Sequence, residues 1–224
     1  MGVEFSIGKV SEAQPQSCVF DAMADALAGP GWGVFPNVLD QDMLQTLSVL
    51  AQAQKFRRPA RIGRRLNQRR NLQVRRDNIV WIDNSDPIQK SWLDWNAQLQ
   101  LWLNRSLMMG LSFFESHYAY YAPNAFYAKH LDVFQGPNQQ MLSERAVSLV
   151  LYLNPDWVPG HGGELVLYGR DEQVLAQIAP CMGTIALFNS ADFVHEVLPT
   201  HVPRLSIAGW FHRQPASATA LPVA

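Results

Sequence analysis

The sequence predicts an α+β fold, in which a jelly-roll core (a double-stranded β-helix) carries N-terminal helices packed on one face. Two observations lead to this prediction. Apolar residues recur at helical spacing before Gly110, and beyond it they follow the two-residue period of β-strands. The second part also contains eight short, evenly spaced candidate strands, which is typical of a jelly roll. We expect one domain over residues 1–213, with helical support at about 17–110, a barrel at about 117–213 and a disordered tail at 214–224.

Three segments of the N-terminal half show the apolar spacing of amphipathic helices. The first starts at Ser17 and the second at Asp40, which are residue types that cap helix N-termini. The third starts at Pro87, because proline is favoured in the first helical turn, and a stripe of tryptophans marks its core face. The expected helices cover residues 17–28, 40–53 and 87–110, and short strands are expected at 32–35 and 74–82.

Alternation of apolar and polar residues predicts the strands of the barrel, and proline, glycine and asparagine mark the turns between them. No internal repeat interrupts this pattern. The eight expected strands cover residues 117–122, 127–133, 145–153, 163–168, 173–178, 182–188, 193–198 and 204–212.

Composition restricts the class of protein. The chain has 224 residues, of which 48% are hydrophobic, so it can bury one large core, which argues against wholesale disorder. Its formal net charge of −1 gives no overall attraction for nucleic acid. Its two cysteines, Cys18 and Cys181, cannot build a disulfide framework or a cysteine-based zinc site. Without a secretory signal or an apolar run long enough to span a membrane, we expect a cytoplasmic monomer with no membrane partner.

Three residues of the barrel form the pattern of a metal site. His130 and Asp132 are two positions apart on one expected strand, so both side chains point to the same face. His195, on the seventh expected strand, supplies a second imidazole. Two imidazoles and one carboxylate are the ligand set of mononuclear non-haem Fe(II) sites with open coordination positions. The other four histidines lack such partners, and we interpret them as surface or turn residues: His117, His161, His201 and His212.

An arginine beyond this pattern indicates a second part of the site, which we call the Arg204 pole, where a carboxylate could bind. Arg204 stands nine positions after His195 and opens the eighth expected strand. A guanidinium among small and apolar neighbours binds a carboxylate strongly, through two parallel hydrogen bonds. The sequence therefore predicts a narrow, mostly dry slot for a dicarboxylate. The residues expected on its walls are Arg204, Ser206, Ala208 and Trp210 from one strand, and Ser148, Val150 and Tyr152 from another.

Six segments of the barrel carry a specific set of motifs. They read YAPNAFYAKHLDVF from residue 121, RAVSLVLYLNPDW from 145, GGELVLY from 162, GTIALF from 183, HEVLP from 195 and SIAGWF from 206. Together they resemble the prolyl 4-hydroxylase type of 2-oxoglutarate oxygenases, in particular the hypoxia-inducible-factor prolyl hydroxylases and their bacterial relatives. Upstream, VRRDNIVWI from residue 74 resembles a family strand, although Arg76 stands where a glycine is usual. The resemblance covers roughly residues 74–212.

The resemblance implies Fe(II), 2-oxoglutarate and O2 as cofactor and co-substrates, and it implies a role for each site residue. Tyr120 competes with Tyr121 for one of these roles, because alternation turns the two side chains to opposite faces. The carboxylate of Asp132 argues for hydroxylation, since halogenating family members lack it. The implied metal ligands are His130, Asp132 and His195, the implied 2-oxoglutarate residues are Arg204, Tyr152, Tyr121, Val197, Leu165 and Trp210, and the implied substrate-side residues are Arg75 and Asp77.

The function implied by the resemblance is hydroxylation of a prolyl residue in a protein substrate, with elongation factor Tu as one candidate. Two other functions stay open. Nine arginines between Arg57 and Arg76 suggest a nucleic-acid oxygenase, although this cluster lacks the interleaved aromatic residues that stack bases. A non-catalytic binding module on the same barrel is the third interpretation, and the complete metal pattern argues against it. The cluster precedes VRRDNIVWI, where the resembled family has a segment that folds over the substrate, so the resemblance favours a lid; a docking surface and a solvated loop stay open.

Overall fold

The computed structural model describes residues 16–54, 74–133 and 144–213. The predicted tail at 214–224 and most of the arginine cluster, residues 57–73, lie outside the described residues. The helices are α1 (Gln16–Ala28), α2 (Gln41–Gln54) and α3 (Pro87–Leu107). The strands are β1 (Trp32–Phe35), β2 (Asp77–Trp81), β3 (Leu111–Tyr121), β4 (Tyr127–His130), β5 (Arg145–Tyr152), β6 (Leu165–Tyr168), β7 (Val174–Ile178), β8 (Ile185–Asn189), β9 (Val194–Val197) and β10 (Arg204–Arg213).

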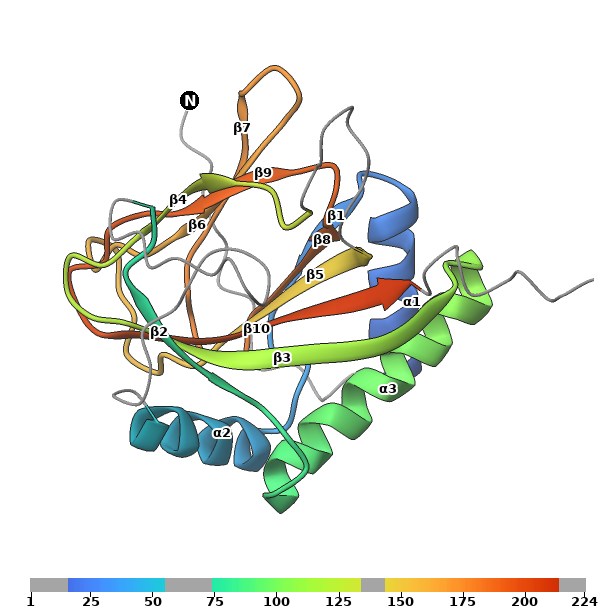
Figure 1. Ribbon diagram of the computed structural model, residues 1–224, viewed down its shortest axis with the longest axis horizontal. Helices are drawn as coiled ribbons and strands as arrows, with labels where there is room; N and C mark the ends of the chain where they lie inside the picture. The colour runs from blue at the N-terminus through green and yellow to red at the C-terminus, as the bar shows by residue number, and fades with distance from the viewer. Residues whose placement is uncertain (1–15, 55–73, 134–143, 214–224) are drawn as a thin grey trace, which may run out of the picture.

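Two antiparallel sheets form the barrel. A six-stranded sheet has the order β1-β8-β5-β10-β3-β2, and a four-stranded sheet has the order β4-β9-β6-β7. In Figure 1 the four-stranded sheet lies above the six-stranded sheet, and the three helices flank the large sheet away from it. Strands consecutive in the chain alternate between the sheets from β3 to β6, which is the connectivity of a double-stranded β-helix. The predicted fold class is confirmed.

The large sheet is buried on both faces, and each face has its own apolar cluster. Leu149 and Leu151 of β5 point to the helices, where they join Trp92 of α3 and Leu44 of α2. Their neighbour Tyr152 points the other way, into a cluster between the two sheets. The period-two alternation of β5 therefore separates a supporting face from an inner face, and the inner face contains the candidate site.

The helix boundaries follow from their caps. Asp40 Oδ1 accepts a hydrogen bond of 2.9 Å from the backbone N–H of Met43, and Asp86 caps α3 directly before Pro87. Both starts were expected. The first helix differs, because α1 already includes Gln16, so Ser17 lies within it rather than at its cap. The third helix ends at Leu107 instead of 110, because Met108 adopts a left-handed conformation.

Several strand boundaries also differ from the expected ones: β2 begins at Asp77 instead of 74, and β8 begins at Ile185 instead of 182. β3 begins at Leu111, six residues earlier than expected, since it pairs along its length with β10 and also with β2. β4 ends at His130, three residues earlier than expected, and its pairing with β9 shifts register between Tyr127 and His130. All eight expected barrel strands are nevertheless present, as are the two short strands before them.

Over the described part of the chain, every helix is too short or too polar to cross a membrane. Cys18 and Cys181 are both free thiols, as expected.

Candidate active site

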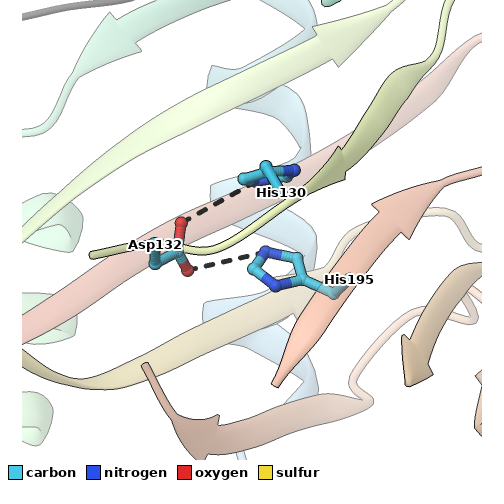
Figure 2. A group of neighbouring side chains, drawn as sticks. All are labelled: His130, Asp132 and His195. Atoms are coloured by element: carbon cyan, nitrogen blue, oxygen red, sulfur yellow. Dashed lines mark ion pairs between the residues drawn. The ribbon is translucent and has the colours of Figure 1, made fainter. Parts of the chain in front are cut away.

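His130, Asp132 and His195 converge between the two sheets. One ligand atom from each lies within 4.8 Å of the others, and they form the one such cluster of three found among the described residues. His130 comes from the end of β4, Asp132 from the bend after it, and His195 from β9, which pairs with β4. Figure 2 shows both imidazole rings turned toward the carboxylate. The short β4 means that Asp132 reaches this position from a bend rather than from the continued strand that the sequence predicted.

Backbone carbonyls orient both imidazoles. His130 Nδ1 lies 2.8 Å from the carbonyl oxygen of Ala128, and His195 Nδ1 lies 3.1 Å from that of Phe193. A carbonyl can only accept, so each Nδ1 carries a proton, and in the neutral ring Nε2 is then the electron-pair donor. The two Nε2 atoms face Asp132 at 3.8 Å for His130 and 3.6 Å for His195. This tautomer is the one that a metal bound at Nε2 requires.

Two serines hold the carboxylate of Asp132. Ser148 Oγ donates a hydrogen bond of 2.6 Å to Asp132 Oδ2, and Ser190 Oγ lies 2.8 Å from Ser148 Oγ. All three side chains are buried. Burial opposes ionisation of Asp132, but the two histidines, Arg145 and the Ser148 hydrogen bond together keep its pKa below the usual value. Burial, followed by the proximity of His195, lowers the pKa of His130 to about 3. The cluster therefore presents an ionised carboxylate beside a neutral imidazole.

Arg204 forms the second pole, on the inner face of β10. Its side chain is buried, and Nε donates a hydrogen bond of 2.7 Å to the Gly163 carbonyl while Nη1 donates one of 3.0 Å to Ser206 Oγ. The guanidinium carbon lies 4.8 Å from the ring centroid of Tyr121 and 5.2 Å from that of Tyr152. No carboxylate neutralises Arg204 among the described residues. A buried cation of this kind calls for an anionic ligand.

Gly163 makes room for this arginine. Its φ is +78°, a conformation that residues with side chains rarely adopt, and a Cβ built there would lie 2.8 Å from Arg204 Cδ. Sterics thus explain why the second residue of the GGELVLY segment is a glycine, because any side chain at residue 163 would displace Arg204.

Tyr152 offers a hydroxyl next to Arg204. Its side chain is completely buried, and the hydroxyl oxygen has no hydrogen-bond partner among the described residues. Burial raises the pKa of Tyr152 well above its usual value, so the hydroxyl keeps its proton and can donate it in a hydrogen bond. A buried donor without a partner is costly unless a ligand supplies an acceptor.

Tyr121, and not Tyr120, lies on the inner face. Tyr121 belongs to the apolar cluster between the sheets and is paired with Arg204 across the strands. Tyr120 packs against the helix-side cluster instead. Leu165 and Val197 are cross-strand partners in the small sheet, and both join the inner cluster with Tyr152.

Trp210 lies at the level of the three metal-site residues, away from Arg204. It is six residues further along β10, or about 20 Å at the usual strand rise. Its cross-strand neighbour is Ser148, which binds Asp132. The Trp210 ring lies 3.6 Å from the guanidinium carbon of Arg145, which is ion-paired with Glu115.

His117 is a residue that the sequence interpretation placed wrongly. It is 3% exposed, not a surface residue, and its ring lies 5.1 Å from the ring of Trp81 and 5.4 Å from that of Trp210. Burial, and then the charge of Arg75, lower its pKa to about 3, so it is neutral. His212 is also no surface residue, since it lies half-buried in β10, 3.0 Å from Glu115 Oε1. Alternation from Tyr121 would have placed His117 on the inner face.

Arg75 and Asp77 bind each other. Arg75 Nε and Nη2 donate hydrogen bonds of 2.8 and 2.6 Å to the two carboxylate oxygens of Asp77. The Asp77 side chain is fully buried. The part of the arginine cluster that the structure describes thus includes an arginine already neutralised by a carboxylate.

The residues present fit both a divalent metal and a dicarboxylate. Two imidazole nitrogens and an ionised carboxylate suit a divalent first-row metal, and these three ligands leave coordination positions for others. The unpartnered Tyr152 hydroxyl and the unneutralised guanidinium of Arg204 suit the far carboxylate of a compound such as 2-oxoglutarate.

Comparisons with known proteins agree with this chemistry. A family described as the 2OG-Fe(II) oxygenase superfamily matches residues 116–212. The structure of a prolyl-4-hydroxylase from Pseudomonas putida is similar over 88% of this chain and 100% of that chain, with 34% identity and a TM-score of 0.77. A Trichoplax adhaerens prolyl hydroxylase, solved with a hypoxia-inducible-factor peptide, shares the fold at 23% identity and a TM-score of 0.75, over 92% of this chain and 94% of that one.

Curated relatives match over shorter regions. The prolyl 3-hydroxylase sudestada1 of Drosophila melanogaster is 30% identical over 130 residues, which is 51% of this chain and 23% of that protein. The prolyl 3-hydroxylase OGFOD1 of Xenopus laevis is 35% identical over 80 residues, or 32% of this chain and 16% of that protein. The chain thus spans less than a quarter of these relatives.

Fold, site and similarity together show the family to which this chain belongs. The chain belongs to the 2OG-Fe(II) oxygenase superfamily, in the group that includes the Pseudomonas putida prolyl-4-hydroxylase. The residues that the chain brings together in the site fit the cofactor and co-substrates of that superfamily, Fe(II), 2-oxoglutarate and O2.

Proposed function

We propose that this protein hydroxylates a prolyl residue of a protein substrate. The reaction consumes 2-oxoglutarate and O2, and it inserts one oxygen atom into a prolyl C–H bond. The second oxygen atom enters succinate, and the lost carboxyl group leaves as CO2. The observation that carries the proposal is the pairing of the His130, Asp132 and His195 cluster with the buried Arg204 pole, in a chain 34% identical to a prolyl-4-hydroxylase over nearly its whole length.

In this proposal His130, Asp132 and His195 bind Fe(II). Bound iron supplies the oxidising power for hydroxylation, together with 2-oxoglutarate and O2. The protein's part is to hold both imidazoles in the Nδ1–H tautomer through Ala128 and Phe193, and to hold the carboxylate through Ser148. Each ligand is thereby oriented before the metal binds.

Arg204 and Tyr152 bind the far carboxylate of 2-oxoglutarate. Tyr121 lies against Arg204, and Leu165 with Val197 forms an apolar wall that excludes water. In such a dry slot a charge-assisted hydrogen bond is stronger than in water, which favours a dicarboxylate over a monocarboxylate.

The prolyl residue of the substrate must reach His130, Asp132 and His195 between the two sheets. Trp210 and His117 lie on β10 and β3 at that level, and both are buried, so they line the interior of the site rather than a docking surface. Their Nε1 and Nδ1 atoms have no hydrogen-bond partner among the described residues. Elongation factor Tu remains a candidate substrate, as the sequence resemblance suggested.

Mass spectrometry tests the proposed reaction. Purified protein with Fe(II), 2-oxoglutarate and O2 is incubated with elongation factor Tu. A second incubation uses an extract of cells from which the gene has been deleted. The expected product is a single prolyl peptide heavier by one oxygen atom, formed by the wild type and not by His195→Ala. Oxygen gained only on nucleic acid, or on no proline at all, would refute the proposal.

Arg204→Lys tests the co-substrate pole separately. Lysine keeps the charge but cannot donate two parallel hydrogen bonds, so the KM for 2-oxoglutarate should rise by about tenfold or more. Mn(II) affinity, measured without 2-oxoglutarate, should stay within about twofold of the wild type, because Arg204 makes no contact with the metal cluster. An unchanged KM would remove Arg204 from the proposed role.

A further inference from the structure

We infer that Arg75, Asp77 and Tyr127 are positioning residues that hold the imidazole of His130 in place. The inference rests on the proposed function, since it takes His130 as a metal ligand. It assigns to Arg75 and Asp77 an internal role in place of direct contact with the substrate.

A chain of contacts leads from the ion pair to the ligand. The Tyr127 ring stacks on the His130 imidazole, with centroids 3.6 Å apart and 16° between the ring planes. The guanidinium carbon of Arg75 lies 4.4 Å from the centroid of the same Tyr127 ring. This distance is within the range of a cation–π contact. Tyr127 thus lies against both the proposed ligand and a fixed cation.

Asp77 fixes the plane of the guanidinium. The two hydrogen bonds between Arg75 and Asp77 are parallel and bidentate, a geometry that lysine cannot reproduce. The Arg75 and Asp77 side chains are only 12% and 0% exposed. Because each satisfies the charge of the other, neither presents a free charge to a polypeptide outside.

The backbone of the same segment joins the two sheets. Ala128 N–H donates to the Val74 carbonyl at 2.8 Å, and Arg76 N–H donates to the Phe126 carbonyl at 3.1 Å. The next residue, Asp77, pairs with Tyr121 in the large sheet. Residues 74–77 therefore connect β4, which ends at His130, with the large sheet. Among the described residues of the small sheet, β4 pairs with β9 alone, so residues 74–77 give it a second lateral support.

Two restraints act on the His130 ring in this arrangement. The Nδ1 contact to Ala128 fixes the direction in which Nε2 points. The stack on Tyr127 fixes the tilt of the ring plane, which one hydrogen bond leaves adjustable. Contacts that orient a metal ligand typically change metal affinity by about 10- to 100-fold when they are removed.

The test compares Tyr127→Leu with Tyr127→Phe in the full-length protein freed of metal. The dissociation constant for Mn(II) is measured by electron paramagnetic resonance, without 2-oxoglutarate or O2. Tyr127→Leu removes the ring and should weaken Mn(II) binding by about tenfold, whereas Tyr127→Phe keeps the ring and should stay within about twofold of wild type. The visible spectrum of bound Co(II) should change in Tyr127→Leu alone, because it reports ligand geometry.

Tyr168→Leu is the matched control. Tyr168 lies in the same sheet with a Lys129 ammonium 3.7 Å from its ring centroid, and its hydroxyl donates to Glu196, but it makes no contact with the metal cluster. Loss of a tyrosine and of a cation–π contact there should leave Mn(II) affinity unchanged. An equal loss of affinity in Tyr168→Leu would show a general effect on the sheet and would overturn the inference.

Arg75→Lys supplies a second, independent variant. It keeps the charge but loses the bidentate pair, and it should weaken Mn(II) binding about threefold or more with an altered Co(II) spectrum. If Tyr127→Leu does not fold, the Mn(II) affinity of Arg75→Lys tests the positioning role in its place. If wild type binds no Mn(II), or His130→Ala binds it normally, the proposed function fails. The positioning role alone is refuted by a different result. In that case wild type binds Mn(II) and His130→Ala does not, while folded Tyr127→Leu and Arg75→Lys bind Mn(II) with the affinity and the Co(II) spectrum of wild type.

Discussion

The two carboxylate oxygens of Asp132 have different surroundings. Oδ2 accepts the Ser148 hydrogen bond, whereas Oδ1 faces His130 Nε2 at 3.8 Å. A hydroxyl has one proton, and that of Ser148 goes to the carboxylate, so Ser190 must be the donor in the bond between the serines. This chain of two buried hydroxyls fixes the rotation of the carboxylate about its Cβ–Cγ bond.

Removal of the Ser148 hydroxyl should therefore weaken the metal site. We expect Ser148→Ala to raise the dissociation constant for Mn(II) by about tenfold, and Ser190→Ala, one bond further away, to raise it less. Ser148→Thr keeps the hydroxyl and serves as the control. Calorimetric titration of the metal-free protein measures all four constants, and equal values for Ser148→Ala and wild type would contradict the expectation.

At the scale of single residues, sequence reasoning recovers what depends on local period. His130, Asp132 and His195 were found because a two-residue spacing and strand order are visible in one dimension. Alternation from Tyr121 also turns His117 inward, but the two rings that cover it, Trp81 and Trp210, come from other strands and are not visible in its local pattern. The mutual pairing of Arg75 with Asp77 depends on rotamers, which spacing does not determine.

The helices and the large sheet separate stability from chemistry. Trp92 of α3 is completely buried on the helix side, and its Nε1 donates a hydrogen bond of 3.1 Å to Ser116 Oγ. Phe188, on the opposite face of the sheet, contacts the His195 ring at 4.8 Å between centroids. Substitutions on these two faces should therefore have different consequences.

We expect Trp92→Ala to lower the free energy of unfolding by about 3–5 kcal/mol, since it leaves a large cavity. For a chain of this length that corresponds to a decrease in Tm of roughly 6–20 °C. Mn(II) affinity of the molecules that remain folded should be unchanged, because Trp92 does not reach the inner face. Differential scanning calorimetry and metal titration of one preparation check both statements, and a loss of affinity would show that the faces are coupled.

At the scale of elements, the number and type of the described helices and strands could be predicted, as could the capped starts of α2 and α3, but several strand ends could not. Alternation is clear in β5, where Leu149 and Leu151 face the helices and Tyr152 faces the inner cluster. The end of β4 depends on its register shift against β9, a partner more than sixty residues away. The early start of β3 depends on Phe113 and Phe114, whose neighbours His212 and Phe211 lie on β10.

The site draws on both sheets, so the whole molecule should respond to its ligands. His130 and His195 belong to the small sheet, whereas Tyr152 and Arg204 belong to the large one. A metal and a dicarboxylate bound together would contact both sheets, and any ligand that binds only the folded state stabilises it.

Thermal unfolding measures this effect. At a metal concentration about 100 times the dissociation constant, Mn(II) should stabilise the fold by ~2.7 kcal/mol. That amount corresponds to an increase in Tm of roughly 5–10 °C. Addition of a chelator should reverse the increase, and His195→Ala should show none. An equal increase in His195→Ala would indicate that the ion binds elsewhere.

The steric relation between Gly163 and Arg204 also governs how this sequence can change over generations. A side chain at residue 163 would push Arg204 out of place, since the built Cβ and Arg204 Cδ are only 2.8 Å apart. Two constraints favour glycine at residue 163: the space that Arg204 needs and the φ of +78°. Loss of Arg204 would remove the first of them. The two positions are expected to be inherited as a pair. A barrel in which both have been replaced would mark a lineage that has exchanged its dicarboxylate for a different co-substrate.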